Sequence, residues 1–130
     1  MSEVRIVGAA HVGLFIKDVE VSKKYYCDIL GFKVIWEYDL DGIKVCFVQN
    51  GDLVLELVQD LVFNDCGDGI VNHVAMKVEN IEAVKEDLAA KGVVFEEENI
   101  TFEPRCFPNG SKWILFRGPD GERLEISEVL

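Results

Sequence analysis

The chain contains an internal repeat, and this repeat restricts its fold more than any other feature. The segment His11-Val-Gly-Leu-Phe-Ile-Lys-Asp-Val-Glu20 returns 62 residues later as His73-Val-Ala-Met-Lys-Val-Glu-Asn-Ile-Glu82. In both copies an apolar, strand-like run leads into the start of a helix. The repeat therefore predicts that the two halves of the chain fold alike.

Both predicted helices carry the same start and stop signals. Asp18 and Asn80 are the predicted N-cap residues, whose side chains accept a hydrogen bond from an amide of the first turn. Gly31 and Gly92 stand where each helix is expected to end, because glycine adopts the left-handed conformation that closes helices. The apolar stripes expected to pack against the core are Val21, Tyr25 and Ile29 in the first helix, and Ile81, Val84 and Leu88 in the second.

Three strand-like segments, rich in β-branched and aromatic residues, follow each helix. The predicted strands are Lys33–Tyr38, Ile43–Gln49 and Leu53–Gln59 in the first half, and Val93–Glu97, Trp113–Arg117 and Arg123–Glu128 in the second. The last strand of each half also matches the other, with Glu56 and Glu125 in equivalent places. The order of elements indicates an α+β fold of two tandem β-α-β-β-β units, about 5–59 and 71–129.

We expect the two units to form a single domain over residues 1–130, because about 60 residues make only a marginal core. The predicted link between the units is about Asp60–Ile70. The longest irregular stretch is about Glu98–Lys112, and a loop of that length in a compact domain is often a lid or a binding loop.

Composition excludes several classes of partner. The formal net charge of −11 argues against nucleic acid and against an anionic membrane surface, since both attract lysine and arginine. No apolar run approaches the roughly 20 residues that span a bilayer, and the N-terminus resembles no secretion signal. The four cysteines form no C-x-x-C pair. Free thiols in the cytoplasm are therefore expected.

Four residues are candidate metal ligands. His11 and His73 are the only histidines of the chain and occupy equivalent points of the repeat, as do Glu56 and Glu125. Two imidazoles and two carboxylates make a mixed nitrogen and oxygen site that suits Zn, Ni, Co, Mn or Fe. A pseudo-two-fold duplication would bring the two pairs together at its centre.

Each ligand also has a plain structural interpretation. A lone histidine in an apolar strand is usually a hydrogen-bonded core residue, and Glu125 shares its strand face with Arg123 and Ser127, as an exposed carboxylate would. Glu56 differs, because valines flank it on its own face and leucines fill the other face. An unpaired carboxylate buried there would cost several kcal/mol, roughly, unless a metal, an arginine or a proton compensates it.

Three segments carry a resemblance to a known family: the His11-Val-Gly-Leu opening, Tyr25-Tyr-Cys-Asp-Ile-Leu-Gly-Phe32, and Phe116-Arg-Gly-Pro-Asp-Gly-Glu-Arg-Leu-Glu-Ile126. With the duplicated unit, they resemble the vicinal-oxygen-chelate superfamily over about Arg5–Val129. The resemblance implies a cupped mixed sheet with helices on its outside. It also implies one divalent metal ion per site, with nickel or zinc favoured and cobalt, manganese or iron as alternatives, and it implies a homodimer.

The order His11, Glu56, His73, Glu125 is similar to that of short bacterial glyoxalase I, a lactoylglutathione lyase. The resemblance implies a metal-dependent lyase or isomerase that acts on a hemithioacetal or another 2-hydroxycarbonyl through a metal-bound enediolate. Within this scheme Glu125 is the first choice for the catalytic base and Glu56 the second. Whether the four ligands come from one chain or from two copies stays open from the sequence.

The substrate also stays open. Arg5, Arg105, Lys112 and Arg117 are the basic side chains considered for the carboxylates of glutathione, and each has an alternative as solvated surface. The run of acidic residues at 96–98 would repel such an anion if it faced the site. The alternatives are an epimerase or isomerase on a sugar or hydroxy-acid substrate without glutathione, and a non-catalytic small-molecule-binding module. Residues considered for an apolar substrate wall, with core packing as the alternative, are Phe102, Phe107 and Trp113.

Overall fold

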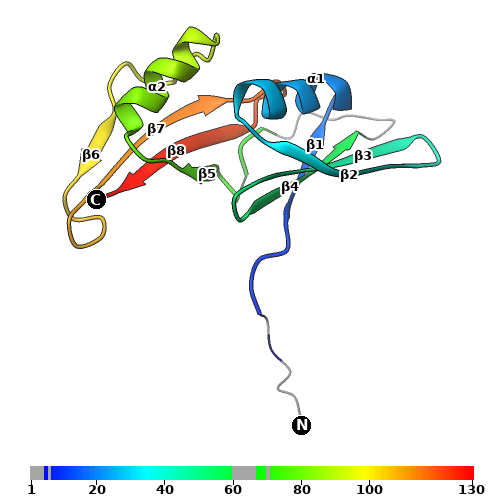
Figure 1. Cartoon of the computed structure of the whole chain (residues 1–130), viewed down its shortest axis with the longest axis horizontal. Coiled ribbons are helices and arrows are strands. Elements are labelled where there is room, and N and C mark those ends of the chain that lie inside the picture. The colour runs from blue at the N-terminus through cyan, green and yellow to red at the C-terminus, as the bar shows by residue number, and fades with distance from the viewer. Residues whose placement is uncertain (1–4, 6, 60–66, 70) are drawn as a thin grey trace.

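The two halves of the chain form two four-stranded sheets of the same design (Figure 1). A computed structural model describes the whole chain except residues 1–4, 6, 60–66 and 70. The first sheet has the strand order β1-β4-β3-β2, and the second has the order β5-β8-β7-β6. In each sheet the first strand runs parallel to the last strand of its half, and the other pairs are antiparallel. The predicted fold, two tandem β-α-β-β-β units of the α+β class, is confirmed.

The elements of the first half are β1 (Val12–Ile16), α1 (Val19–Lys24), a π-helical turn η1 (Tyr25–Ile29), β2 (Lys33–Leu40), β3 (Ile43–Asn50) and β4 (Leu53–Gln59). Those of the second half are β5 (Val74–Lys77), α2 (Ile81–Ala90), β6 (Thr101–Glu103), β7 (Ser111–Arg117) and β8 (Arg123–Val129). Most of the predicted link lies outside the described residues. In the described part of the chain, no helix is long and apolar enough to cross a bilayer.

Both helices begin at the predicted cap residues. The Asp18 carboxylate accepts hydrogen bonds from the amides of Glu20 and Val21, at 2.9 and 3.4 Å. The side chain of Asn80 accepts from the amide of Ala83, and the Glu128 carboxylate on β8 accepts from the amides of Asn80 and Ile81. A strand of the second sheet therefore satisfies the free amides at the start of α2 and holds that helix against it.

The predicted stripe of the first helix is correct in part: Tyr25 and Ile29 pack against the core, but the fully buried face is a neighbouring one. The buried residues are Val19, Ser22 and Tyr26, whereas Val21 is half exposed. The reason is that Ser22 and Tyr26 have polar partners in the second half: Ser22 Oγ donates to Asp120, and Tyr26 Oη donates to Glu122 at 3.0 Å. In α2 the predicted stripe is correct, since Ile81 and Leu88 are buried and Val84 packs beside them.

Two predictions for the second half are wrong in detail. Val93–Glu97 is no strand; within it Phe95 makes one isolated bridge to Phe116, and Val94 is exposed. The strand that pairs with β7 is instead β6, which lies inside the stretch predicted to be irregular. Val93 and Phe95 of the predicted strand do pack against the core and Glu96 forms ion pairs with arginines, yet the backbone of this segment bridges β7 only at Phe95.

The two halves share one hydrophobic core. Buried residues of both sheets belong to the same cluster, among them Leu55 and Leu57 of β4 and Leu124 and Ile126 of β8. These residues alternate with Glu56 and Glu125, so each glutamate lies on the sheet face opposite to the core. Both helices lie on the same side of the molecule, above the sheets in Figure 1. The two candidate carboxylates therefore point to the side away from the helices.

Candidate metal-binding site

The first half places His11 next to Glu56. His11 stands one residue before β1, and Gly13 of β1 is the neighbour of Glu56 in the parallel pairing of β1 and β4. His11 Nε2 lies 3.5 Å from Glu56 Oε1. A Cβ atom at position 13 would lie 3.4 Å from the same oxygen, so this glycine leaves room beside the carboxylate. The His11 ring meets Phe47 edge-on, with ring centroids 5.4 Å apart.

The second half repeats this arrangement with His73 and Glu125. His73 stands one residue before β5, and Ala75 is the neighbour of Glu125 in the pairing of β5 and β8. His73 Nε2 lies 3.9 Å from Glu125 Oε1. The Glu125 side chain is 13% exposed, less than that of Glu56 at 23%. Burial raises the pKa of the Glu125 carboxyl, and the nearby His73 and Arg123 offset part of this effect.

The structure gathers the four predicted ligands as two pairs. In the part of the chain that is described, no three or more histidine, cysteine, aspartate or glutamate side chains lie together as a metal site would require. Each pair nevertheless suits one ion. Two ligands that each lie about 2.1 Å from an ion are at most about 4.2 Å apart, and both observed separations are shorter. The donor types fit a divalent metal, and each pair supplies half of the predicted set.

Aromatic side chains share the sheet face of the Glu56 pair. Phe47 on β3 lies opposite Glu56, and Trp36 on β2 lies opposite Phe47, so the three side chains share one face of the sheet. Phe15 is two residues beyond Gly13 on β1 and shares that face as well. Phe15 and Trp36 are 67% and 65% exposed. We call Phe15, Trp36 and Phe47 the aromatic face. Sequence reasoning missed it, because the residues come from three different strands.

A charged network lies beside the Glu125 pair. Arg117 binds both carboxylate oxygens of Asp68 and also contacts Glu96, and Arg123 binds the same Glu96. The remaining NH1 group of Arg123 donates to Asn72 Oδ1 at 2.7 Å. Asn72 Oδ1 is also 3.0 Å from Nδ1 of His73. The network therefore connects with one of the predicted ligands.

The basic residues considered for an anionic substrate mostly have acidic partners. Arg105 pairs with Glu103 and Lys112 pairs with Glu82. Arg117 belongs to the network of Asp68 and Glu96, and Arg5 lies on the surface. Within the acidic run at 96–98, Glu96 is thus neutralised by two arginines.

Of the residues considered for a substrate wall, Phe102 and Phe107 are exposed, so core packing does not account for them. Trp113 is half-buried and shares the sheet face of Glu125, because Trp113 is paired with Ser127 and Leu115 with Glu125.

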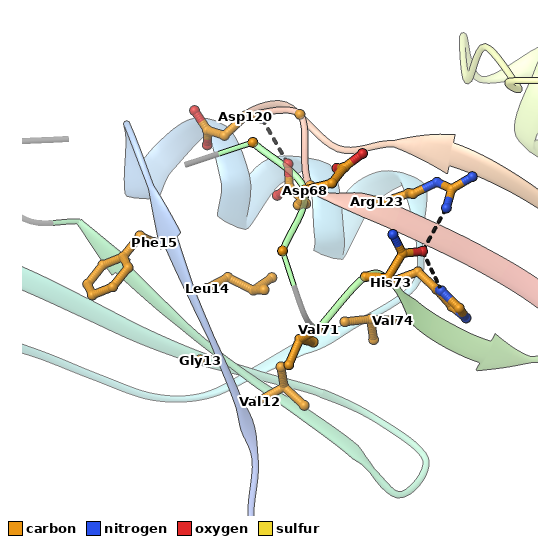
Figure 2. Close-up of a pocket in the computed structure, with 15 residues that line it drawn as sticks. Val12, Gly13, Leu14, Phe15, Asp68, Val71, His73, Val74, Asp120 and Arg123 are labelled. Carbon is orange, nitrogen blue, oxygen red and sulfur yellow. Dashed lines mark hydrogen bonds between the residues drawn. The ribbon is translucent and has the colours of Figure 1, made fainter. Parts of the chain in front are cut away.

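A pocket of about 510 Å³ lies where the two halves meet. Its walls come from β1, from residues 67–69 and 71–74, and from the turn between β7 and β8 (Figure 2). Among the four predicted ligands, His73 lines this pocket, together with Arg123 and the apolar residues Leu14 and Phe15. The pocket thus borders the second pair and does not enclose either carboxylate.

Comparison with known proteins identifies the family of the chain. The profile of the Glyoxalase/Bleomycin resistance protein/Dioxygenase superfamily matches residues 8–126, which includes both units and all four predicted ligands. The chain belongs to this superfamily. The vicinal-oxygen-chelate resemblance seen in the sequence is therefore confirmed.

Relatives within the superfamily have different activities. The chain is 28% identical over 128 residues to a probable lactoylglutathione lyase of Synechocystis, covering 92% of this chain and 93% of the relative. It is 30% identical over 131 residues to the mitochondrial methylmalonyl-CoA epimerase of Mus musculus, covering 92% of this chain and 71% of the relative. Lyases and epimerases thus both occur among its relatives.

Solved structures share the fold over nearly the whole chain. A glyoxalase family protein from Enterococcus faecalis superposes with a TM-score of 0.77 at 26% identity, covering 94% of this chain and 98% of the other. A fosfomycin resistance protein from Listeria monocytogenes, solved with Mn(II) and sulfate, has a TM-score of 0.74 at 18% identity, covering 97% and 95%. At that identity the likeness concerns the fold alone.

Proposed function

We propose that this protein is a metal-dependent lyase or isomerase of glyoxalase type, which removes a proton next to the carbonyl group of a hemithioacetal or another 2-hydroxycarbonyl. The observation that carries this proposal is the matched geometry of the two halves. Each half presents one imidazole nitrogen and one carboxylate oxygen within 4 Å, at equivalent points of the fold. Nickel or zinc is the metal that we propose first, and cobalt, manganese and iron also suit these donors.

We further propose that two copies of the chain complete each site. His11 and Glu56 of one copy would face His73 and Glu125 of the other, and a two-fold axis would create two equal sites. Support comes from the separation of the pairs within the described residues and from the accessibility of both histidines, whose side chains are 41% exposed. The aromatic face is a second argument, since large exposed apolar surfaces usually mark contact with a partner.

The residues of the chain divide the work of proton removal. A bound divalent ion would act as a Lewis acid on the oxygens of the substrate. Glu125 is the proposed base: burial raises the pKa of its carboxyl and so makes the carboxylate a stronger proton acceptor. Glu56 is the alternative base and is the more exposed of the two. The aromatic face would exclude water from the reacting carbon.

A second candidate function is epimerisation or isomerisation of a sugar or hydroxy-acid derivative without glutathione. It is favoured by the ion pairs of Arg105, Lys112 and Arg117, each of which already has a carboxylate partner. A thiol conjugate that bound Arg105, Lys112 or Arg117 through a carboxylate would have to compete with the partner that this side chain already has. Members of both functional classes remove a proton next to a carbonyl, so the two candidates share the same base.

The decisive experiment combines metal analysis with the fate of the substrate proton. Purified protein is loaded with Ni²⁺ or Zn²⁺ and assayed in D₂O with methylglyoxal, with and without glutathione, and separately with a 2-hydroxycarbonyl compound in the absence of glutathione. One metal per chain and turnover that needs glutathione support the lyase. Deuterium incorporation into a 2-hydroxycarbonyl without glutathione supports the second candidate. The absence of any stoichiometric metal would refute both and leave a binding module.

A further inference from the structure

We propose that Asn72 is a positioning residue that holds His73 in the tautomer with hydrogen on Nδ1, so that Nε2 is left unprotonated and faces Glu125. The importance of this for metal binding rests on the proposed function. The contacts themselves do not depend on that function. They form a chain from Glu96 through Arg123 and Asn72 to His73. Figure 2 draws the Arg123–Asn72 and Asn72–His73 contacts as dashed lines.

The first step identifies the atom of Asn72 that lies in this chain. This atom of Asn72 lies 2.7 Å from NH1 of Arg123, and a guanidinium group has only hydrogen-bond donors. The contact atom must therefore be the amide oxygen and not the amide nitrogen. Arg123 cannot easily turn away, because its other nitrogens Nε and NH2 donate to the Glu96 carboxylate at 3.2 and 3.0 Å. Arg123 thus settles the orientation of the Asn72 amide.

The second step transfers this orientation to the histidine. Asn72 Oδ1 is 3.0 Å from His73 Nδ1, and an amide oxygen only accepts hydrogen bonds. Nδ1 must then carry the hydrogen. In a neutral imidazole the other nitrogen, Nε2, has a free lone pair, and the bond made by one ring nitrogen is what selects the form of the other.

The third step concerns what Nε2 meets. Its neighbour is Glu125 Oε1, 3.9 Å away, which is too far for a hydrogen bond. With Nε2 unprotonated, two lone-pair atoms face each other with space for a cation between them. Metal-binding histidines generally donate their second ring nitrogen to an oxygen acceptor, which orients the ring and keeps the ligand nitrogen available. Asn72 supplies that acceptor.

The other histidine provides an internal comparison. Within the described residues, His11 has its contacts with Glu56 and with the edge of Phe47, and no acceptor lies at its Nδ1. Because the chain has two histidines, both ring systems can be followed separately in one spectrum. If a substitution of Asn72 changes the spectrum of the His73 ring and not that of His11, the effect is one of positioning and not of a general loss of structure.

The test compares wild type with Asn72→Ala, Asn72→Asp and the control Asn99→Ala. The control removes an exposed amide from a loop of the same half. Imidazole ¹⁵N chemical shifts of the metal-free protein report the tautomer, and titration with Zn²⁺ reports the affinity. We expect the Nδ1–H form of His73 in wild type and its loss in Asn72→Ala, with zinc affinity about 10- to 100-fold weaker. Asn72→Asp keeps an acceptor oxygen and should retain both properties, as should Asn99→Ala.

Two results would overturn the positioning role: a His73 ring with hydrogen on Nε2 in wild type, or an Asn72→Ala protein with unchanged His73 shifts. A shifted tautomer with unchanged zinc affinity would overturn the importance of Asn72 for the metal. A wild-type protein that shows the Nδ1–H form but binds no metal would refute the proposed function and leave the positioning of His73 supported.

Discussion

A mixed dimer tests whether two chains share each site. One chain carries His11→Ala and Glu56→Gln, and the other carries His73→Ala and Glu125→Gln. If the pairs meet across the dimer, the mixed dimer joins the intact pair of each chain into one complete site and leaves the second site without ligands. It should hold one metal ion, and so about half of the wild-type content, by the symmetry of a two-fold dimer.

The dimers formed by each variant alone, which we call the parent dimers, should bind almost no metal. Each of their sites would keep one pair, with N···O separations of 3.5 or 3.9 Å, and lose the other. Four-ligand zinc sites bind with about 10–16 kcal/mol, so the loss of half the ligands removes roughly 5–8 kcal/mol, or about 10⁴-fold or more in affinity. The difference in metal content between the mixed dimer, at about half of wild type, and the parent dimers, with almost none, is large enough to measure reliably.

The assay uses two affinity tags. The two chains are co-expressed, each with its own tag, and the mixed dimer is isolated by two successive purifications. Its metal content is then measured by mass spectrometry after dialysis against the chosen ion. A mixed dimer without metal, or a wild-type protein that binds one ion per chain as a monomer, would refute the shared site.

Three further predictions concern stability and the proposed base. Tyr26→Phe removes a hydrogen bond from a fully buried ring to the Glu122 carboxylate and should lower the free energy of unfolding by about 1.5–3 kcal/mol in a urea titration. Burial raises the pKa of Tyr25 to about 12, whereas an unfolded tyrosine titrates near 10. Stability should therefore be intact below about pH 10 and fall as the pH rises toward 12, and Tyr25→Phe should flatten this part of the profile. Glu125→Gln should abolish deuterium incorporation at the substrate carbon, yet raise the melting temperature of the metal-free protein at pH 7, because an amide avoids the burial of a charge.

Each of these has a matched control. Tyr26→Phe combined with Glu122→Gln should cost little more than either change alone, and full additivity would show that the two side chains do not interact. An alkaline profile unaffected by Tyr25→Phe would contradict the role of its burial. Glu97→Gln changes an exposed carboxylate and should alter neither exchange nor melting. Retained exchange in Glu125→Gln would transfer the role of base to Glu56.

Local signals in the chain were sufficient to predict the tandem units. Asp18 and Asn80 cap their helices because a short polar side chain reaches the amides of the first turn, which depends on neighbouring residues alone. The alternation around Glu56 and Glu125 likewise placed both carboxylates on the faces opposite to the core. The four ligand candidates followed from the repeat, since equivalent positions of a duplicated unit have equivalent environments.

Tertiary structure decided what depends on contacts between distant segments. Ser22 became a buried residue because Asp120, 98 residues away, accepts its hydrogen bond. The side chain of Glu125 is less exposed than that of Glu56, although the sequence around Glu125 is the more polar of the two. Above all, the pairing of each histidine with the glutamate of its own half, and the link from Asn72 to Arg123, come from strand register and loop position. A sequence pattern records which residue types recur, whereas the distance between two such residues is set by the packing of the whole chain.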